Sequence, residues 1–323
     1  MAPLWPEAVR SRLAELIDDG LAVFLGGTDT GKSTLIQELH EMIGGEVVDG
    51  DLGQSRIGPP SCISRGDYER TLESYFVGDI SPRGNLLPTV VGLKLMTDHA
   101  RRPCLVDTDG YIGEPAALAY KTELINLLKP DVLVLLQRAG ELEYFRLYSR
   151  KRVKVVTVRV NHQGLKSREE RIRAREEAFR TYFAKAELRR WPLQELRFER
   201  VPFGHGEPIE NPELEKLLDC TVLGAWRHGP RATLLLEGRP APGSLTELKQ
   251  ALGLEFIDLV SGAALQDRLV GCLLRGELQG LGIIKRVREG MVEVLTPATE
   301  ATVLQLGRLR VAEDGRHLRL PPE

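Results

Sequence analysis

Residues 21–34 read LAVFLGGTDTGKST, and this stretch sets the fold class of the chain. Its first six residues form a mostly apolar run, the pattern G-x-x-x-x-G-K-[ST] follows at 26–33, and a helical pattern begins at Lys32. A strand, a glycine-rich loop and a helix in this order bind phosphate, because backbone N–H groups of the loop and the helix N-terminus point at one anion. The sequence therefore predicts an α/β domain that binds a nucleotide.

Each part of this loop has an expected task in binding ATP. The glycines let the backbone wrap around the β-phosphate, Lys32 should reach the β- and γ-phosphates, and the Ser33 hydroxyl should ligate Mg²⁺. We therefore expect ATP and Mg²⁺ as cofactors. The residues expected to contact the nucleotide are Gly27, Thr28, Asp29, Thr30, Gly31, Lys32, Ser33 and Thr34.

Val- and Leu-rich runs alternate with helical patterns along the first half of the chain. The expected strands are 21–26, 46–50, 103–107, 131–137 and 153–160, and the expected helices lie near 32–43, 91–99 and 114–128. Strands that alternate with helices of this length are joined by crossover connections. Continuous apolar runs indicate strands that are covered on both faces. We predict a P-loop NTPase-type, doubly wound and mostly parallel sheet.

The second half of the chain has a different character. Residues 166–186, KSREERIRAREEAFRTYFAKA, form a very basic helical segment, and between Arg150 and Arg200 there are 16 Lys or Arg against 7 Glu and no Asp. This excess suits an anionic partner or a solvated helical surface. Glycines and prolines then separate short strand-like segments. We place a P-loop domain at 1–202 and a smaller, mainly β C-terminal domain at 203–323.

The composition is that of a globular protein. Of the 323 residues 42% are hydrophobic and 28% charged, and the net charge is −2. The apolar runs are far shorter than the roughly 20 residues of a membrane-spanning helix, and the N-terminus is expected to form a short amphipathic helix started by Pro6 rather than a signal peptide. Four single cysteines without a CxxC pair favour a reduced, cytoplasmic setting over a zinc or redox centre.

Carboxylates end two of the predicted strands. Asp49-Gly50-Asp51-Leu52-Gly53-Gln54 follows the strand at 46–50, and Asp107 ends the strand at 103–107, the position of a Walker B aspartate. Asp49 and Asp51 face the same way on an extended segment, so one could orient an acceptor hydroxyl while the other holds a metal-bound water. The residues alone leave open whether Asp51 or Asp107 takes the metal and base duties. A guanine-specific N-K-x-D is absent, which argues against a GTPase.

With these motifs in place, the chain resembles the polynucleotide 5′-hydroxyl kinase family. This family includes the RNA kinase subunit of the eukaryotic pre-mRNA cleavage factor, nucleolar kinases of pre-ribosomal-RNA processing, and archaeal polynucleotide kinases. The likeness covers about residues 21–310. It is carried by Gly27–Thr34, by D-x-D-x-G-Q at 49–54, by FVGDISPRG at 76–84, by Thr108-Asp109-Gly110-Tyr111, by Arg171, Arg175 and Arg180 with Tyr182-Phe183, and by 281–285, 294–297 and 306–308.

The chain departs from the family pattern in two places. Tyr111 stands where the T-x-G-W substrate clasp of the family has Trp. Eukaryotic members also carry an N-terminal β domain before the P-loop, whereas some 20 residues precede it in this sequence.

The resemblance implies transfer of the ATP γ-phosphate to the 5′-hydroxyl end of single-stranded RNA or DNA, under a helical lid at about 166–186. Asp51 would orient or deprotonate the hydroxyl, and the two lid arginines, four residues apart on one helical face, would reach the γ-phosphate. Tyr111 would stack on a nucleobase. The implied residues are Lys32, Asp51, Gln54, Arg171 and Arg175 for catalysis, Ser33, Asp51 and Thr108 for the metal, and Gln54, Arg56, Thr108 and Tyr111 for the substrate, with Arg65, Arg70 and Arg83 as further backbone contacts.

Two functions of other classes stay open at this point. A P-loop kinase that acts on a nucleoside or a coenzyme precursor would have a closed pocket beside Asp51 rather than an open basic cleft. A catalytically silent P-loop subunit of an RNA-processing complex would have no chemical need for Lys32, Ser33, Asp51 and the lid arginines together. The preference between RNA and DNA and any protein partners are not encoded in a readable motif.

Overall fold

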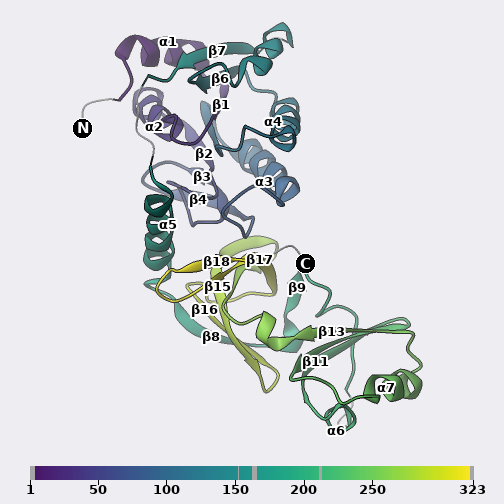
Figure 1. Cartoon of the computed structure of the whole chain (residues 1–323). Helices are drawn as coiled ribbons and strands as arrows, with labels where there is room; N and C mark the ends of the chain where they lie inside the picture. Colours follow the sequence, from purple (N-terminus) through teal and green to yellow (C-terminus); the bar gives the residue numbers. More distant parts are fainter. Residues whose placement is uncertain (1–3, 152, 162–165, 211–212, 321–323) are drawn as a thin grey trace. The chain divides into compact units, whose positions relative to one another are not determined.

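The computed structural model describes residues 4–151, 153–161, 166–210 and 213–320. The chain divides into two compact units, Met1–Ala178 and Phe179–Glu323 (Figure 1). Within the described ranges, no helix is long and apolar enough to cross a membrane.

A seven-stranded sheet forms the centre of the first unit. Its strands are β1 (Leu21–Gly26), β2 (Glu46–Gly50), β3 (Cys62–Gly66), β4 (Thr71–Phe76), β5 (Cys104–Thr108), β6 (Val132–Gln137) and β7 (Lys154–Arg159). They lie in the order β4-β3-β2-β5-β1-β6-β7, and the five strands from β2 to β7 run parallel. Every residue of β1, β2, β5 and β6 is buried, as continuous apolar runs require. The predicted doubly wound, mostly parallel sheet is confirmed.

The hairpin of β3 and β4 was not predicted. It pairs antiparallel to β2 at one edge of the sheet. Residues of β4 are largely exposed or half-buried, so they lack the apolar run that marks a covered strand.

Helices cover both faces of this sheet. They are α1 (Glu7–Ile17), α2 (Lys32–Ile43), α3 (Leu86–His99), α4 (Pro115–Leu128) and the 3-10 helix η1 (Glu143–Lys151). Helix α5 (Arg168–Phe183) comes after β7 along the chain. Side chains of α1 and α2 pack with Phe24 on one face, whereas α3, α4 and η1 pack with Val23 and Leu25 on the other. Helix α3 begins five residues earlier than expected, because Pro88 lies in its first turn, where a missing N–H costs nothing.

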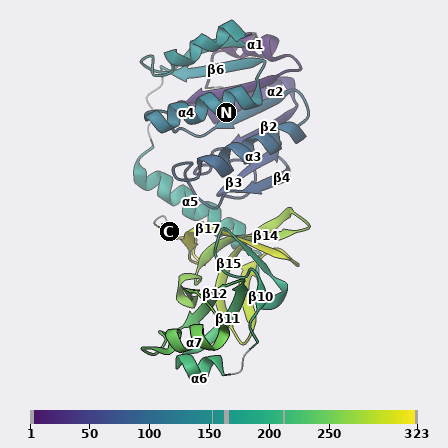
Figure 2. The same ribbon diagram turned by 90° about the vertical axis from the view of Figure 1, so that its right-hand side faces the viewer.

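The second unit is mainly β, as predicted. Its strands are β8 (Glu187–Pro192), β9 (Arg197–Glu199), β10 (Glu207–Pro208), β11 (Thr221–His228), β12 (Arg231–Glu237), β13 (Phe256–Ser261), β14 (Arg268–Leu274), β15 (Glu277–Arg288), β16 (Met291–Thr296), β17 (Val303–Val311) and β18 (His317–Arg319). They form one sheet of order β18-β17-β14-β15-β16-β8, with β9 added at β17, and a second of order β10-β11-β12-β13. The short helices of this unit are α6 (Leu214–Leu218), α7 (Ser244–Leu252), η2 (Leu193–Glu195) and η3 (Gly262–Ala264). Helices α6 and α7 lie side by side against the second sheet (Figure 2).

The boundary between the units differs from the expected position at residue 202. Strand β8 pairs antiparallel with β16, and β9 pairs parallel with β17, so residues 187–199 belong to the C-terminal sheet. Their partners lie about a hundred residues further along the chain, and local sequence patterns carry no information about such pairings. Helix α5 starts in the first unit and ends in the second.

Candidate active site

The P-loop connects the carboxyl end of β1 to α2. Gly31 has φ 80° at the N-cap of α2, a left-handed conformation that glycine adopts without strain. Lys32 is buried, and its Nζ donates to the carbonyl oxygens of Gly26 at 2.9 Å and Gly27 at 3.0 Å. The Thr30 hydroxyl donates to Gly27 at 2.9 Å. These bonds hold the ammonium inside the loop, where a triphosphate oxygen can replace the carbonyls.

Asp49 organises the loop that follows β2. Its Oδ2 accepts from the Arg56 N at 2.6 Å and the Ile57 N at 3.0 Å and from the Ser55 hydroxyl at 3.2 Å, and its Oδ1 accepts from the Asp51 N at 3.0 Å. Both oxygens are thus engaged inside the protein. Of the two strand-end acids at 49 and 51, this one has a structural task.

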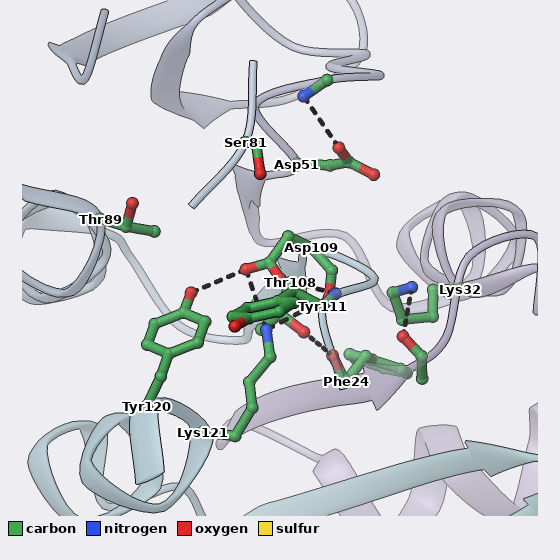
Figure 3. A network of polar contacts seen from close by, with 12 residues as sticks. Phe24, Lys32, Asp51, Ser81, Thr89, Thr108, Asp109, Tyr111, Tyr120 and Lys121 are labelled. Atoms are coloured by element: carbon green, nitrogen blue, oxygen red, sulfur yellow. Dashed lines mark hydrogen bonds and ion pairs between the residues drawn. The ribbon is translucent and has the colours of Figure 1, made fainter. Parts of the chain in front are cut away.

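Asp51 keeps one oxygen for chemistry. Its Oδ1 accepts from the N–H groups of Gly53 at 3.0 Å and Gln54 at 3.1 Å, and its Oδ2 has no hydrogen-bond partner in the described part of the chain (Figure 3). Burial raises the pKa of Asp51, and the nearby Lys32 ammonium acts in the opposite direction. A carboxylate with one fixed and one available oxygen can accept a proton from a hydroxyl group.

Asp107 is the penultimate residue of β5 and lies beside Asp49, its register partner in β2. It is buried, and within the described residues its Oδ1 has no hydrogen-bond partner. Burial raises the pKa of Asp107, while Lys32 and a hydrogen bond with the Ser33 side chain lower it. An unpartnered buried carboxylate oxygen next to a P-loop hydroxyl fits Mg²⁺, a hard cation that prefers oxygen ligands. No cluster of three or more metal-binding side chains exists among the described residues, and Mg²⁺ needs none because phosphates and water complete its shell.

The Thr108 hydroxyl has a different partner from the one expected. It is completely buried and donates to the Phe24 carbonyl of β1 at 2.7 Å. The hydroxyl therefore links β5 to β1 through its proton, and its expected roles as metal and substrate ligand stay predictions.

The start of α5 is tied to the P-loop. The Arg171 guanidinium binds Asp29 Oδ2 at 3.0 Å, and the Lys166 N–H binds the same oxygen at 3.1 Å. The Gln54 amide donates to the Arg171 carbonyl at 3.4 Å. Burial and the Arg171 charge lower the pKa of Arg175, whereas the Asp51 carboxylate raises it. The two arginines thus lie close to each other, and both lie near the acids of the site.

Tyr111 presents a half-buried ring beside the P-loop. Its hydroxyl donates to Glu114 at 2.8 Å, and the Arg83 guanidinium lies 4.9 Å from the ring centroid while also pairing with Glu114. The ring therefore makes a cation–π contact with Arg83, and it also packs against the hydrophobic core of the first unit. Its stacking on a nucleobase stays a prediction.

A buried network lies behind Tyr111 (Figure 3). Asp109 Oδ2 accepts from the Tyr120 hydroxyl at 2.7 Å and from Lys121 Nζ at 2.9 Å. Its Oδ1 accepts from the Tyr111 N–H at 2.9 Å. Burial lowers the pKa of Lys121, and the Asp109 carboxylate opposes this effect.

Comparison with known proteins identifies the group to which this site belongs. A family model described as the P-loop of the mRNA cleavage and polyadenylation factor CLP1 matches residues 26–185. Over these residues the chain is similar to this family. The match includes the P-loop, the acids after β2 and β5, and the basic helix α5.

Curated archaeal relatives extend the likeness over nearly the whole chain. A protein of Thermococcus kodakarensis named polyribonucleotide 5′-hydroxyl-kinase is 29% identical over 326 residues, which is 92% of this chain and 89% of the relative. Proteins with the same name from Pyrococcus horikoshii and Methanocaldococcus jannaschii are 28% and 27% identical, over 96% and 92% of this chain and 91% and 89% of the relatives.

Solved structures share the fold. The structure of a wild-type Clp1p–Pcf11p complex matches with a TM-score of 0.61 and 12% identity, over 94% of this chain and 78% of that chain. At this identity the likeness concerns the fold alone.

The expected site residues fall into two groups. Most of them gather at the carboxyl edge of the sheet, where β1, β2 and β5 end. Arg56 lies there as well, and it donates to Gln37 and Thr34 at the start of α2. Arg65 does not, because it pairs with Glu46, at the opposite end of β2, and with Glu73. Arg70 lies in the turn between β3 and β4.

The sequence patterns did not indicate that Asp109, Tyr120 and Lys121 form a cluster. The available signal was a lysine inside the apolar pattern of α4, ALAYKTELINLL, at a position that faces the core. A charged residue at such a position needs a buried partner of opposite charge.

Proposed function

We propose that this protein is an ATP-dependent polynucleotide 5′-hydroxyl kinase, which transfers the γ-phosphate of ATP to the 5′-hydroxyl end of single-stranded RNA or DNA. One observation carries the proposal. The available oxygen of Asp51 lies in the same site as the P-loop ammonium of Lys32 and the lid arginine Arg175, whose charges act on it. A base that can accept the proton of a hydroxyl group therefore lies in one site with cations that can bind a phosphoryl group.

Each group has an assigned task in the transfer. Asp51 takes the proton as the 5′-oxygen bonds to the γ-phosphorus, and the bond from that phosphorus to the β–γ bridging oxygen of ATP breaks to release ADP. Lys32 and the two lid arginines neutralise the charge that spreads over the γ-phosphate oxygens. Gln54 links the Asp51 loop to α5 and so brings the lid and the base together.

We assign Mg²⁺ to Ser33 and Asp107. These residues combine a P-loop hydroxyl with the buried carboxylate oxygen that has no partner among the described residues. The cation would supply charge neutralisation at the β- and γ-phosphates. This assignment gives the metal to Asp107 and leaves Asp51 to the acceptor.

Two further assignments rest on the relatives and on the cysteines. The names of the archaeal relatives favour RNA as the acceptor. We also place the protein in the cytoplasm, because its four cysteines are free and three of them are buried, which suits a reducing compartment.

Acceptor length tests the proposed function directly. With γ-labelled ATP, we expect label on 5′-hydroxyl RNA and DNA oligomers, and kcat/KM should fall as salt rises because phosphate contacts release counterions. A nucleoside should be a poor acceptor, since it lacks the downstream phosphates that help to align its hydroxyl. The measurement compares a nucleoside, a 3′-nucleotide and an oligomer at two salt concentrations.

Two outcomes would contradict this function. A nucleoside phosphorylated as well as the oligomer, without a salt effect, would indicate a small-molecule kinase. ATP binding without label on any acceptor would indicate a silent scaffold subunit.

The spacing between the P-loop and the loop after β5 gives a second prediction. A Cβ at Gly110 would lie 2.6 Å from Thr28 Oγ1 and 2.7 Å from the Thr28 N, so Gly110→Ala must push P-loop backbone aside. Overpacking of this kind costs about 1–3 kcal/mol, and we expect ATP affinity to fall by about 5- to 150-fold in a titration. Gly113→Ala is the matched control, because its Cβ meets nothing within 4 Å. Equal ATP affinity for both variants would contradict this prediction, because it would show that the P-loop backbone can move away from the Gly110 Cβ without a cost to ATP binding.

A further inference from the structure

Lys121 is a buried lysine that the transfer itself does not use. It lies on α4 with 0% of its surface exposed. A buried ammonium costs several kcal/mol unless it is paired. Its partners are Asp109, through Oδ2 at 2.9 Å and the carbonyl oxygen at 3.2 Å, and the Tyr120 ring, whose centroid lies 4.5 Å away. Lys121 therefore neutralises the buried carboxylate of Asp109 and holds it in place.

Asp109 in turn fixes the start of the loop that follows β5. It accepts hydrogen bonds from Tyr111, Tyr120 and Lys121, one from the loop itself and two from α4. Together these bonds attach the loop to the helix behind it. If the Lys121 charge were removed, a buried carboxylate would lose its cation, and the loop would shift to bring Asp109 into contact with water.

The same loop reaches both halves of the site. On one side, Gly110 lies directly against Thr28 of the P-loop, and Ile112 packs 3.2 Å from the Cβ position of Gly27. On the other side, it carries the Tyr111 ring with Arg83 over it. The position of the ring relative to the phosphates is therefore set by the attachment of this loop.

We propose that the buried Lys121–Asp109–Tyr120 cluster is the positioning element of the acceptor site, which holds the Tyr111 ring at the place where the 5′-terminal base stacks. This inference rests on the proposed function. Lys121 acts through Asp109 and touches neither substrate, so it is a positioning residue. Its effect should depend on whether the acceptor carries a base at its 5′ end.

The experiment compares two 5′-hydroxyl oligomers with the same phosphates, one with a normal 5′-terminal nucleotide and one with an abasic residue at that place. Wild type should prefer the normal oligomer by about 5- to 150-fold in kcat/KM, the range that the stacking of one base gives. Tyr111→Ala should bring this ratio close to one. Lys121→Met should reduce this kcat/KM ratio to about three or less, mainly because the rate on the normal oligomer falls. Lys121→Arg should restore part of the preference for the normal oligomer.

Two further variants keep the test decisive. Tyr120→Phe keeps the ring, removes one hydrogen bond to Asp109 and should give an intermediate ratio even if Lys121→Met does not fold. Lys94→Met on α3, far more exposed than Lys121, should keep the wild-type ratio. The inference is overturned if the folded variants lower kcat/KM on both oligomers by the same factor, or if wild type shows no preference. If wild type phosphorylates neither oligomer, the proposed function itself fails.

Discussion

Asp51→Asn is expected to lower kcat by at least about 100-fold while ATP still binds, because the general base is lost. The structure explains why this substitution should remove the base without disturbing the loop. The Asn carbonyl oxygen can keep the two bonds that Oδ1 accepts from Gly53 and Gln54, so the turn is retained. The amide nitrogen replaces Oδ2, the oxygen that has no partner among the described residues, and an amide cannot take a proton from the acceptor. Single-turnover kinetics at saturating ATP measures the effect.

Asp107→Asn provides the contrast. Asp107 is the proposed Mg²⁺ ligand, so this variant should need a higher Mg²⁺ concentration for half-maximal rate and recover part of its activity when Mg²⁺ is raised. Asp98→Asn, at the exposed end of α3, should behave as wild type. If Asp51→Asn turns over normally while Asp107→Asn is inactive at every Mg²⁺ concentration, the two acids must exchange roles.

Loss of a lid arginine should have the other large effect. Arg175→Ala should lower kcat by about 10³-fold or more, the contribution of a cation that acts in the phosphoryl-transfer transition state. ATP affinity should stay within a few-fold, because the charge acts mainly in that state. Arg171→Ala should lower kcat similarly and also weaken ATP binding, since Asp29 then lies in the P-loop without the cation that it binds at 3.0 Å.

A comparison on the same helix checks this prediction. Arg173 is exposed between the two lid arginines, so Arg173→Ala should retain nearly full activity. In the double variant Asp29→Asn/Arg171→Ala, ATP affinity should return toward the wild-type value while kcat stays low. Single-turnover rates of Arg175→Ala and Arg171→Ala equal to that of Arg173→Ala would remove the lid from the mechanism.

The fold of the first unit could be predicted from the sequence because the patterns that determine its strands and helices lie within short stretches of the chain. Five apolar residues and the first glycine of the P-loop form β1, and the start of α2 follows from the same stretch. The basic helix predicted at 166–186 is α5, Arg168–Phe183. The candidate residues after β1, β2 and β5 could also be grouped in advance, because parallel strands place their carboxyl ends at one edge.

The tertiary structure decided which way each polar group faces. Asp49 and Asp51 are alike in sequence, yet one has both oxygens bound by its own loop and the other keeps one available. Thr108 bonds across to Phe24, and Lys121 bonds across to Asp109.

Sequence patterns describe neighbours along the chain, and they establish the strands, the P-loop and the basic helix because backbone conformation and burial depend on short-range residue spacing. A hydrogen bond or an ion pair needs two groups that meet in space. Asp29 and Arg171 are separated by 142 residues, and β8 and β16 by about a hundred, so only the folded chain brings them together. The roles of these side chains and the boundary between the units therefore depend on the tertiary structure.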